Sequence, residues 1–254
     1  MSAPRAMIVR APGTNRDGDV ALALTLAGAH PFVALIGELE ARPSLLDTAD
    51  LLVLAGGFSY ADSLGAGRVL ALDLHRHLGD ALARFVGSGR PVIGICNGFQ
   101  ALVRTGLLAG LGAERRVALA ANDTGRFDCR WVRLHPVSQR CVWTAELDPV
   151  VTIDCPIAHG EGRVVCDDDT LAALRAGDQI ALRYDVNPNG SVDGIAGITD
   201  PSGVVLGLMP HPENHVLARQ HPTYLRRAGG PGPAPGLGLE LFVNGVRHAK
   251  ELSL

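Results

Sequence analysis

The feature that most constrains this chain is the segment 94–100, Gly-Ile-Cys-Asn-Gly-Phe-Gln, which follows a short apolar run at 91–93. An apolar strand, a Gly-x-Cys-x-Gly turn and a helix predicted over 97–108 together form the pattern of a nucleophile elbow. Its two glycines permit a turn that is too tight for larger side chains. Cys96 lies at the apex of this turn and is the first candidate for a reactive residue.

The position of Cys96 favours chemistry at its sulfur. The thiolate is the nucleophilic form of cysteine, and the partial positive charge of a helix N-terminus stabilises it. A buried structural cysteine is the alternative, because free cysteine is among the most buried residue types. The flanking glycines and the strand-to-helix context favour the reactive interpretation.

Short apolar strands alternate with helices in the first half of the chain. Strands are predicted at 7–9, 31–36, 51–55 and 91–95, and helices at about 19–28, 69–87 and 97–108. From about 116 to 210 the pattern changes to short β-type runs separated by Gly, Asn, Asp and Pro, with one helix near 168–176. We therefore predict a flavodoxin-like α/β fold, in which a doubly wound, mostly parallel sheet carries a partly antiparallel wing.

The length and composition are those of one α/β unit. With 254 residues, of which 47% are apolar, the chain can bury a full core, and we predict a single domain over 1–254. This domain includes a Pro/Gly-rich loop at 229–236 and a C-terminal amphipathic helix at 237–250.

Charge and cysteine content argue against several classes of partner. The net charge is −3 without a lysine- or arginine-rich block, so nucleic acid is not expected as a partner. Because the sequence shows neither a leader peptide nor an apolar run of spanning length, we expect a soluble, cytoplasmic protein without membrane contact. The five cysteines contain no CxxC pair, which indicates neither a disulfide framework nor a metal site.

A cysteine nucleophile for acyl chemistry needs a base, and the base needs an orienting group. The candidates lie in Pro-His-Pro-Glu at 210–213, directly after an apolar strand at 204–209. Residues before proline favour extended conformations, in which side chains two positions apart point the same way. Glu213 can then accept a hydrogen bond from one ring nitrogen of His211 and leave the other to face a thiol. The alternative is a chance surface pair.

Three further segments are candidates for contact with a ligand or for plain turns. Gly56 and Gly57 follow the strand at 51–55, at the sheet edge where α/β proteins bind ligands, although a lone Gly-Gly is more often a turn. The connection at 156–163 concentrates polar groups and two glycines, and we expect it to face a ligand. The segment 187–191 has the composition of a turn, and we expect it to be solvated.

Together these segments resemble the glutaminase subunit of phosphoribosylformylglycinamidine synthase, a triad-type glutamine amidotransferase of purine biosynthesis. The resemblance runs in one colinear order through PGTNRD (12–17), GGFSYAD (56–62), GICNGFQ (94–100), PIAHGEGR (156–163), NPNGS (187–191), IAGI (195–198) and PHPE (210–213). Ala61 and Asn214 depart from the glycine and arginine that are usual in this family.

The resemblance implies a role for each matching residue. Cys96 matches the nucleophile, His211 its base and Glu213 the third member of the triad. The backbone N–H groups of Gly57 and Asn97 match the oxyanion hole, which stabilises the negative oxygen of the reacting carbonyl.

The substrate pocket and the reaction also follow from the resemblance. Gln100 matches a residue that holds the α-substituents of glutamine, and His159, Gly160 and Glu161 match the opposite wall. L-Glutamine would be hydrolysed to glutamate and ammonia through a thioester on Cys96. The ammonia would pass to a large synthetase subunit that uses ATP and Mg, in a complex with a small bridging subunit, so that no cofactor is expected in this chain.

Two other interpretations remain open. The chain could be a glutaminase or γ-glutamyl hydrolase of another pathway, built on the same elbow. It could also be a non-catalytic regulatory docking subunit that keeps the fold, although the intact triad argues against that. The absence of a P-loop or nucleotide fingerprint from the sequence fits a subunit that only supplies ammonia.

Overall fold

The computed structural model describes residues 2–109, 116–227 and 237–253. Its helices are α1 (Asp17–Leu26), α2 (Ile36–Ala41), α3 (Arg68–Gly87), α4 (Asn97–Thr105), α5 (Asp168–Ala176), α6 (Tyr224–Arg227) and α7 (Leu239–Glu251). Its strands are β1 (Arg5–Arg10), β2 (His30–Leu35), β3 (Leu51–Leu54), β4 (Val92–Ile95), β5 (Ala118–Ala121), β6 (Asp128–Pro136), β7 (Ile153–His159), β8 (Glu161–Val165), β9 (Ile180–Tyr184), β10 (Ile195–Thr199) and β11 (Val205–Leu208).

Within these described residues, nine strands form one sheet in the order β2-β1-β3-β4-β11-β10-β9-β6-β7, while β5 and β8 form a separate two-stranded ribbon. The first five strands of this order are parallel to one another, and each later pair is antiparallel. The predicted α/β class, with a parallel half and an antiparallel wing, is therefore confirmed.

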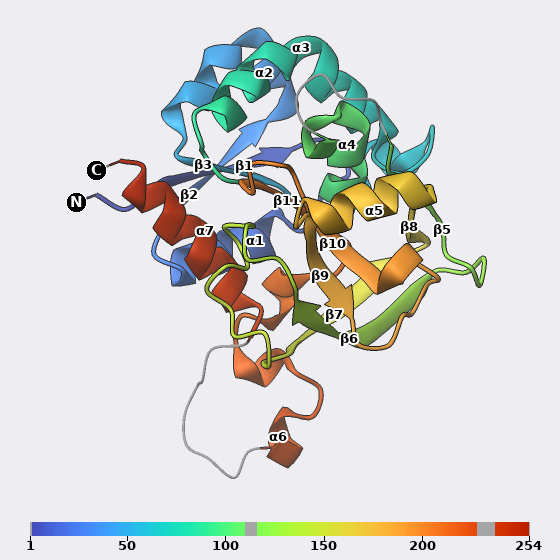
Figure 1. The fold of residues 1–254 in the computed structure, drawn as a ribbon. Helices are drawn as coiled ribbons and strands as arrows, with labels where there is room; N and C mark the ends of the chain where they lie inside the picture. The colour runs from blue at the N-terminus through green and yellow to red at the C-terminus, as the bar shows by residue number, and fades with distance from the viewer. Residues whose placement is uncertain (1, 110–115, 228–236, 254) are drawn as a thin grey trace.

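Helices cover both faces of the parallel half. Figure 1 shows α2, α3 and α4 on one side of the sheet and α1 with α7 on the other. The central strands β3, β4 and β11 are accordingly buried along their whole length, as continuous apolar runs predict for a parallel sheet. Their carboxyl ends carry the Gly-Gly turn, the elbow and the segment that leads to His211.

Two local predictions were wrong. Residue 36 was placed in a strand but begins α2. The connection predicted at 156–163 is mostly strand, because β7 continues to His159 and β8 begins at Glu161. The backbone of β7 pairs with β6 along its whole length, whereas β8 pairs with β5, so the polar residues 159–161 lie where the chain passes directly from the main sheet to the two-stranded ribbon.

The C-terminal helix predicted at 237–250 corresponds to α7, which packs against α1. The predicted Pro/Gly-rich loop at 229–236 lies outside the described residues. In the described parts of the chain, no helix is both long and apolar enough to span a bilayer.

Candidate active site

Cys96 occupies a strained turn between β4 and α4, as the elbow pattern predicted. Its φ of +49° and ψ of −104° are rare for a residue other than glycine, and such strain is concentrated at functional sites. A Cβ added at Gly98 would lie 1.9 Å from the carbonyl oxygen of Leu54, and one added at Gly94 would lie 2.8 Å from the oxygen of Gly98. Both glycines are therefore required for α4 to begin in contact with the sheet.

His211 and Glu213 form a buried pair directly after β11. The Nδ1 atom of His211 lies 2.7 Å from Oε1 of Glu213, and the two residues are 3% and 0% exposed. Glu213 lies in a 3₁₀ helix, η5 (Pro212–His215), and not in the extended segment from which the pairing was predicted. The pairing is confirmed, whereas the backbone conformation inferred for Glu213 was wrong.

The His211 ring faces the elbow. It lies over Gly56, where an added Cβ would be 2.8 Å from the ring carbon Cε1. Burial alone lowers the pKa of His211, but the Glu213 carboxylate and the hydrogen-bonded Cys96 sulfur outweigh it and raise this pKa to about 10. His211 therefore carries a proton at neutral pH and can act as a proton donor at the elbow.

Gly57 holds a close approach between two loops at the end of β3. Its φ is +140°, and an added Cβ would lie 2.8 Å from the backbone nitrogen of Asn15 and 2.9 Å from the oxygen of Gly13. The next residue, Phe58, donates a backbone hydrogen bond to Gly13 at 3.0 Å. The segment 12–17, which the sequence analysis treated only as a matching motif, supports the turn that would hold the oxyanion donor.

A pocket of about 180 Å³ lies beside Cys96. It is lined by Gly57, Phe58, Asp62, Ala66, Cys96, Gln100, Phe127, Ala158, His159, Gly160 and Glu161. The predicted nucleophile, Gly57 of the predicted oxyanion hole and all four predicted substrate-binding residues therefore line one pocket, whereas Asn97, His211 and Glu213 are not among its lining residues. A larger hollow of about 800 Å³ along α3 does not include Cys96 and carries none of this chemistry.

The pocket has one wall formed by the elbow and the residues after β3, and an opposite wall formed by residues 158–161. The side-chain amides of Asn97 and Gln100 link these two walls. The Asn97 amide nitrogen donates to Oε1 of Gln100 at 3.0 Å and to Oδ1 of Asp62 at 3.2 Å, while its oxygen accepts from the backbone of Ser59 at 3.1 Å. The Gln100 amide nitrogen donates to the carbonyl of Glu161 at 2.6 Å. Both the oxygen and the nitrogen of the Gln100 amide are therefore hydrogen-bonded within the protein, and this side chain fixes the distance between the two walls.

Three consecutive residues without glycine form a left-handed turn at the pocket edge. Tyr60, Ala61 and Asp62 have φ values of +55°, +53° and +51°. Each such residue costs about 1–2 kcal/mol relative to the right-handed conformation. The Tyr60 hydroxyl donates to Asp73 of α3 at 2.6 Å, which anchors the turn. Sequence reasoning treated Asp62 only as the last residue of the matching segment 56–62 and gave it no role.

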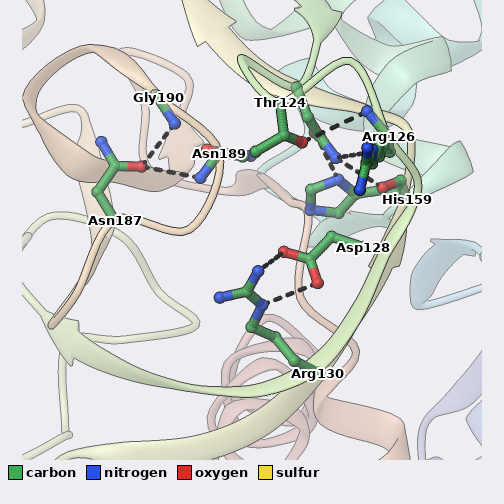
Figure 2. A network of polar contacts seen from close by, with 9 residues as sticks. Thr124, Arg126, Asp128, Arg130, His159, Asn187, Asn189 and Gly190 are labelled. Atoms are coloured by element: carbon green, nitrogen blue, oxygen red, sulfur yellow. Dashed lines mark hydrogen bonds and ion pairs between the residues drawn. The ribbon is translucent and has the colours of Figure 1, made fainter.

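The opposite wall is held by a network of side-chain hydrogen bonds. Asn122 donates to the carbonyls of Arg126 and His159 at 2.9 and 2.8 Å, and its Oδ1 lies 3.0 Å from Nδ1 of His159. Figure 2 shows His159 beside the turn that carries Arg126, with Asp128 on the adjoining strand. No motif in the sequence had pointed to Asn122.

The turn at 187–191 contributes to the same network. The sequence analysis expected it to be solvated, but Asn189 and Ser191 are 0% and 3% exposed, so that expectation was wrong. Asn189 accepts a backbone hydrogen bond from Asp123 at 3.1 Å, and the Ser191 hydroxyl accepts one from Val164 of β8 at 3.0 Å. Figure 2 shows this turn next to the turn that contains Thr124.

His159 is held as a neutral ring. Burial, followed by the positive charge of His211, lowers the pKa of His159 to about 4. With Nδ1 bound to the amide oxygen of Asn122, the proton lies on Nδ1 and Nε2 carries a lone pair. Nε2 is buried and has no hydrogen-bond partner among the residues that the structure describes.

Within the described structure, potential metal ligands come together at one place, which is away from the pocket beside Cys96. Glu40, Asp73 and His77 bring one ligand atom each within 4.8 Å of one another on the surface of α2 and α3. Exposed acidic groups often gather in this way without a metal, and Asp73 is already engaged by Tyr60. Among the described residues, no such group of three ligand atoms lies in the pocket beside Cys96.

Comparison with known proteins agrees with this geometry. The model of the CobB/CobQ-like glutamine amidotransferase domain matches residues 3–249. A phosphoribosylformylglycinamidine synthase subunit PurQ of Treponema denticola is 46% identical, with 85% of this chain and 90% of the relative aligned. This chain belongs to the PurQ family of glutamine amidotransferases.

Further relatives of this PurQ-family chain cover it almost completely. The PurQ subunit of Dehalococcoides mccartyi is 41% identical over 99% of this chain and 100% of its own length. A solved structure described as PurLQS from Thermotoga maritima matches with a TM-score of 0.75 and 34% identity, covering 96% of this chain and 98% of that chain. The family membership therefore rests on the whole amidotransferase domain and not on the elbow alone.

Proposed function

We propose that this chain is the glutaminase subunit of a phosphoribosylformylglycinamidine synthase in purine biosynthesis, where it hydrolyses L-glutamine to glutamate and ammonia. The observation that carries the proposal is the buried pair of His211 and Glu213, set against a cysteine on a strained elbow. Relatives that bear this name match the chain over most of its length.

In the proposed first step, Cys96 reacts as the thiolate beside the protonated His211 ring, and its sulfur attacks the side-chain carbonyl carbon of glutamine. The carbonyl oxygen becomes negative and accepts hydrogen bonds from the backbone N–H groups of Gly57 and Asn97. His211 then gives its proton to the amide nitrogen, the carbon–nitrogen bond breaks, and ammonia leaves a thioester on Cys96.

In the second step, a water molecule attacks the thioester and gives a proton to His211. The carbon–sulfur bond breaks, glutamate is released, and the sulfur and imidazole return to their starting states. Throughout both steps Glu213 holds the His211 ring in one orientation and stabilises its positive charge, which is the ordinary task of a triad carboxylate.

The partners of the reaction are part of the same proposal. Ammonia released at Cys96 would pass to a large synthetase subunit, which uses ATP and Mg, and a small bridging subunit would complete the complex. Support comes from the solved relative, whose description names a PurLQS assembly. We further propose that the complex acts in the cytoplasm, where a reducing environment would keep the five free cysteines of this chain reduced.

Alkylation by a glutamine analogue tests the site. The chain is treated with 6-diazo-5-oxo-L-norleucine and digested, and the adduct is located by mass spectrometry. We expect a single adduct on Cys96, blocked by excess glutamine and absent from Cys96→Ala, with the exposed Cys129 as an internal control. Equal modification of Cys129 and Cys96 would contradict a glutamine site at the elbow.

Ammonia release tests the pathway. We expect the full chain to hydrolyse glutamine faster after addition of its synthetase subunit, and to be inactive on γ-glutamyl peptides. A preference for γ-glutamyl peptides would favour a hydrolase of another pathway. Full glutamine-dependent activity of a complex containing Cys96→Ala would instead support a non-catalytic docking subunit.

A further inference from the structure

The strand β7 forms an outer edge of the main sheet, next to the segments that carry the proposed triad. Among the described strands of that sheet it is the last in the order, and it pairs only with β6. Such an edge carries backbone N–H and C=O groups without a neighbouring strand, which folded proteins usually cover. Pro156, which has no backbone N–H, is typical of an edge strand. The groups that cover this edge therefore fix its position against the rest of the molecule.

The proposed nucleophile and its base both contact this edge. The Cys96 sulfur lies 3.8 Å from the carbonyl oxygen of Ala158, and the backbone N–H of His211 donates to the carbonyl of Pro156 at 2.8 Å. Residues two positions apart in a strand direct their carbonyl groups to the same side, so both contacts follow one line along β7. The edge of β7 thus helps to set how far the His211 segment lies from the sulfur.

His215 makes a third contact of this kind, two residues further along the strand. Its Nδ1–H donates to the carbonyl of Asp154 at 2.5 Å, and the residue is 4% exposed. His215 is the last residue of η5, the short 3₁₀ helix that also carries Glu213. The backbone of His211 therefore binds β7 just before η5 begins, and the ring of His215 binds β7 where η5 ends.

The surroundings of His215 hold its ring in one orientation. The ring of Trp131 meets it edge-on with the centroids 5.2 Å apart, and the centroid of the His221 ring lies 5.4 Å away. Trp131 is paired with Pro156 across β6 and β7, so this packing comes from the wing. The carbonyl of His215 accepts the backbone N–H of Gly238 at 3.0 Å, next to the start of α7. His215 therefore joins η5 to the wing and to α7.

The position of Glu213 depends on this attachment. Short 3₁₀ segments have poorer hydrogen-bond geometry than α-helices, so η5 relies on its neighbours. Oε1 of Glu213 lies 2.7 Å from Nδ1 of His211, while Oε2 is buried and has no hydrogen-bond partner in the described parts of the chain. A movement of η5 by about 1 Å would take the Oε1 contact out of hydrogen-bonding range.

We propose that His215 is a positioning residue for the reaction, which binds the edge of β7 and so holds Glu213 where it orients the His211 ring toward Cys96. The inference rests on the proposed glutaminase function. Because His215 is not among the residues that line the pocket beside Cys96, it acts through Glu213 and not on the substrate.

Replacement of His215 in the complex with the synthetase subunit tests this role. His215→Leu keeps much of the side-chain volume and removes the donor, whereas His215→Asn keeps an N–H donor close to the place of Nδ1. His248→Leu is the matched control, because Nε2 of His248 lies 3.0 Å from the carbonyl of Gly89 and this histidine does not line the pocket either. Ammonia release from glutamine, measured across the alkaline range, gives kcat, KM and the alkaline limb of kcat/KM.

For His215→Leu we expect kcat to fall by about tenfold or more, because a small misplacement of catalytic groups has a large effect on rate. KM should change by less than about twofold, since the pocket lining is intact. The alkaline limb should move to lower pH, because a displaced Glu213 no longer stabilises the proton on His211. His215→Asn should recover most of kcat, and His248→Leu should keep the kcat and the alkaline limb of the parent.

Unchanged kcat in His215→Leu would overturn the inference. A loss of kcat that leaves the alkaline limb in place, or that His215→Asn does not restore, would overturn it as well and assign His215 a role in stability alone. If His215→Leu does not fold, His215→Asn is compared with His215→Gln, whose donor lies nearer to the place of Nε2, and equal kcat in these two variants counts against the inference.

Failure of the proposed function itself looks different from failure of this inference. The parent complex would then release no ammonia from glutamine, and Cys96→Ala would change nothing.

Discussion

The two walls of the pocket are held in place by different means. On the side of the parallel strands, the positions of Cys96, Gly57 and the turn 60–62 depend on backbone conformations that are rare or strained. On the side of the antiparallel wing, β7 pairs with β6 without a register shift as far as His159, and the position of the His159 ring depends on the buried side chain of Asn122. The wall on the side of the parallel strands should therefore be displaced by substitutions that add atoms. The wall on the side of the wing should be displaced by substitutions that remove hydrogen bonds.

This difference assigns different consequences to substitutions on the two walls. The strained wall carries the sulfur and the proposed oxyanion donors, so its displacement should lower kcat. The wing carries part of the proposed substrate site and much of the buried polar network, so its disruption should lower stability and raise KM. The predictions below test this division.

The largest effect is expected for Gly57→Ala. The added Cβ would lie within 3.0 Å of three backbone atoms of residues 13–15, at a φ of +140°. The turn must therefore move, and loss of one oxyanion donor lowers kcat by roughly 10²–10³-fold. Steady-state glutaminase kinetics of the complex measure this loss.

Gly28→Ala is the matched control for this substitution. Its φ is also positive, at +90°, but the added Cβ would have no neighbour within 4 Å. It should cost some stability and leave kcat unchanged. Equal values of kcat in the two variants would show that the strained wall does not control the chemistry.

On the wing, Asn122→Ala removes the amide that satisfies two carbonyls and the His159 ring. Because these groups are buried, we expect the free energy of unfolding to fall by about 2 kcal/mol. KM should rise more than kcat falls, since His159 loses its fixed orientation. Urea denaturation and steady-state kinetics provide the two measurements.

Asn187→Ala is the control on the neighbouring turn, because Asn187 is exposed and does not line the pocket. A smaller loss of stability and an unchanged KM are expected. If Asn187→Ala raises KM as much as Asn122→Ala does, the wall is not positioned through Asn122.

A third prediction concerns pH. The Glu213 carboxylate and the Cys96 sulfur raise the pKa of His211 to about 10 against the effect of burial. Because ammonia leaves with a proton from His211, activity should fall as the pH rises through this pKa. Glu213→Gln removes the charge of one partner, so the alkaline limb of kcat/KM should move to lower pH by about one unit or more.

The raised pKa of His211 also makes the free energy of unfolding depend on pH. A folded-state pKa above the unfolded value of 6.5 contributes stability that is present below pH 6.5 and is lost as the pH rises through about 10. In Glu213→Gln the folded-state pKa of His211 is lower, so this loss should be smaller and complete at a lower pH, whereas Glu240→Gln on the exposed face of α7 should not change it. An alkaline limb that stays in place would mean that Glu213 does not set the charge of His211.

The elbow and the pairing of His211 with Glu213 could be predicted from sequence because each is encoded locally. Gly94 and Gly98 flank Cys96, and Glu213 follows His211 by two positions, so the chemistry and the backbone constraints appear within a few residues. The order of apolar runs and helices likewise predicted the parallel half of the sheet, since its central strands β3, β4 and β11 are continuous apolar segments.

The pocket walls could not be predicted in the same way because they depend on contacts between distant segments. Asn122 meets His159 across 37 positions, and the extension of β7 to His159 follows from pairing with β6. Asn189 belongs to a turn whose composition predicts solvent exposure, but it is buried, and its backbone accepts a hydrogen bond from Asp123 in a turn that is distant in sequence. Nothing local to Asp62 indicated that it would face Glu161 in a shared pocket.

The smallest predicted effect measures the backbone strain of the turn 60–62, in the wall on the side of the parallel strands. Ala61 has a φ of +53° in the middle of the left-handed turn, a conformation that glycine adopts without the steric penalty. Ala61→Gly should therefore raise the free energy of unfolding by about 1 kcal/mol, although glycine normally destabilises a folded chain.

Ala21→Gly within α1 gives the matched comparison, and there the same exchange should lower the free energy of unfolding by about 1 kcal/mol. Opposite signs for the two variants in urea denaturation would show that the turn at 60–62 stores strain. Destabilisation by both variants would show that the turn is not strained at Ala61, and the wall that carries Asp62 would then be held by side-chain contacts, as the wing is.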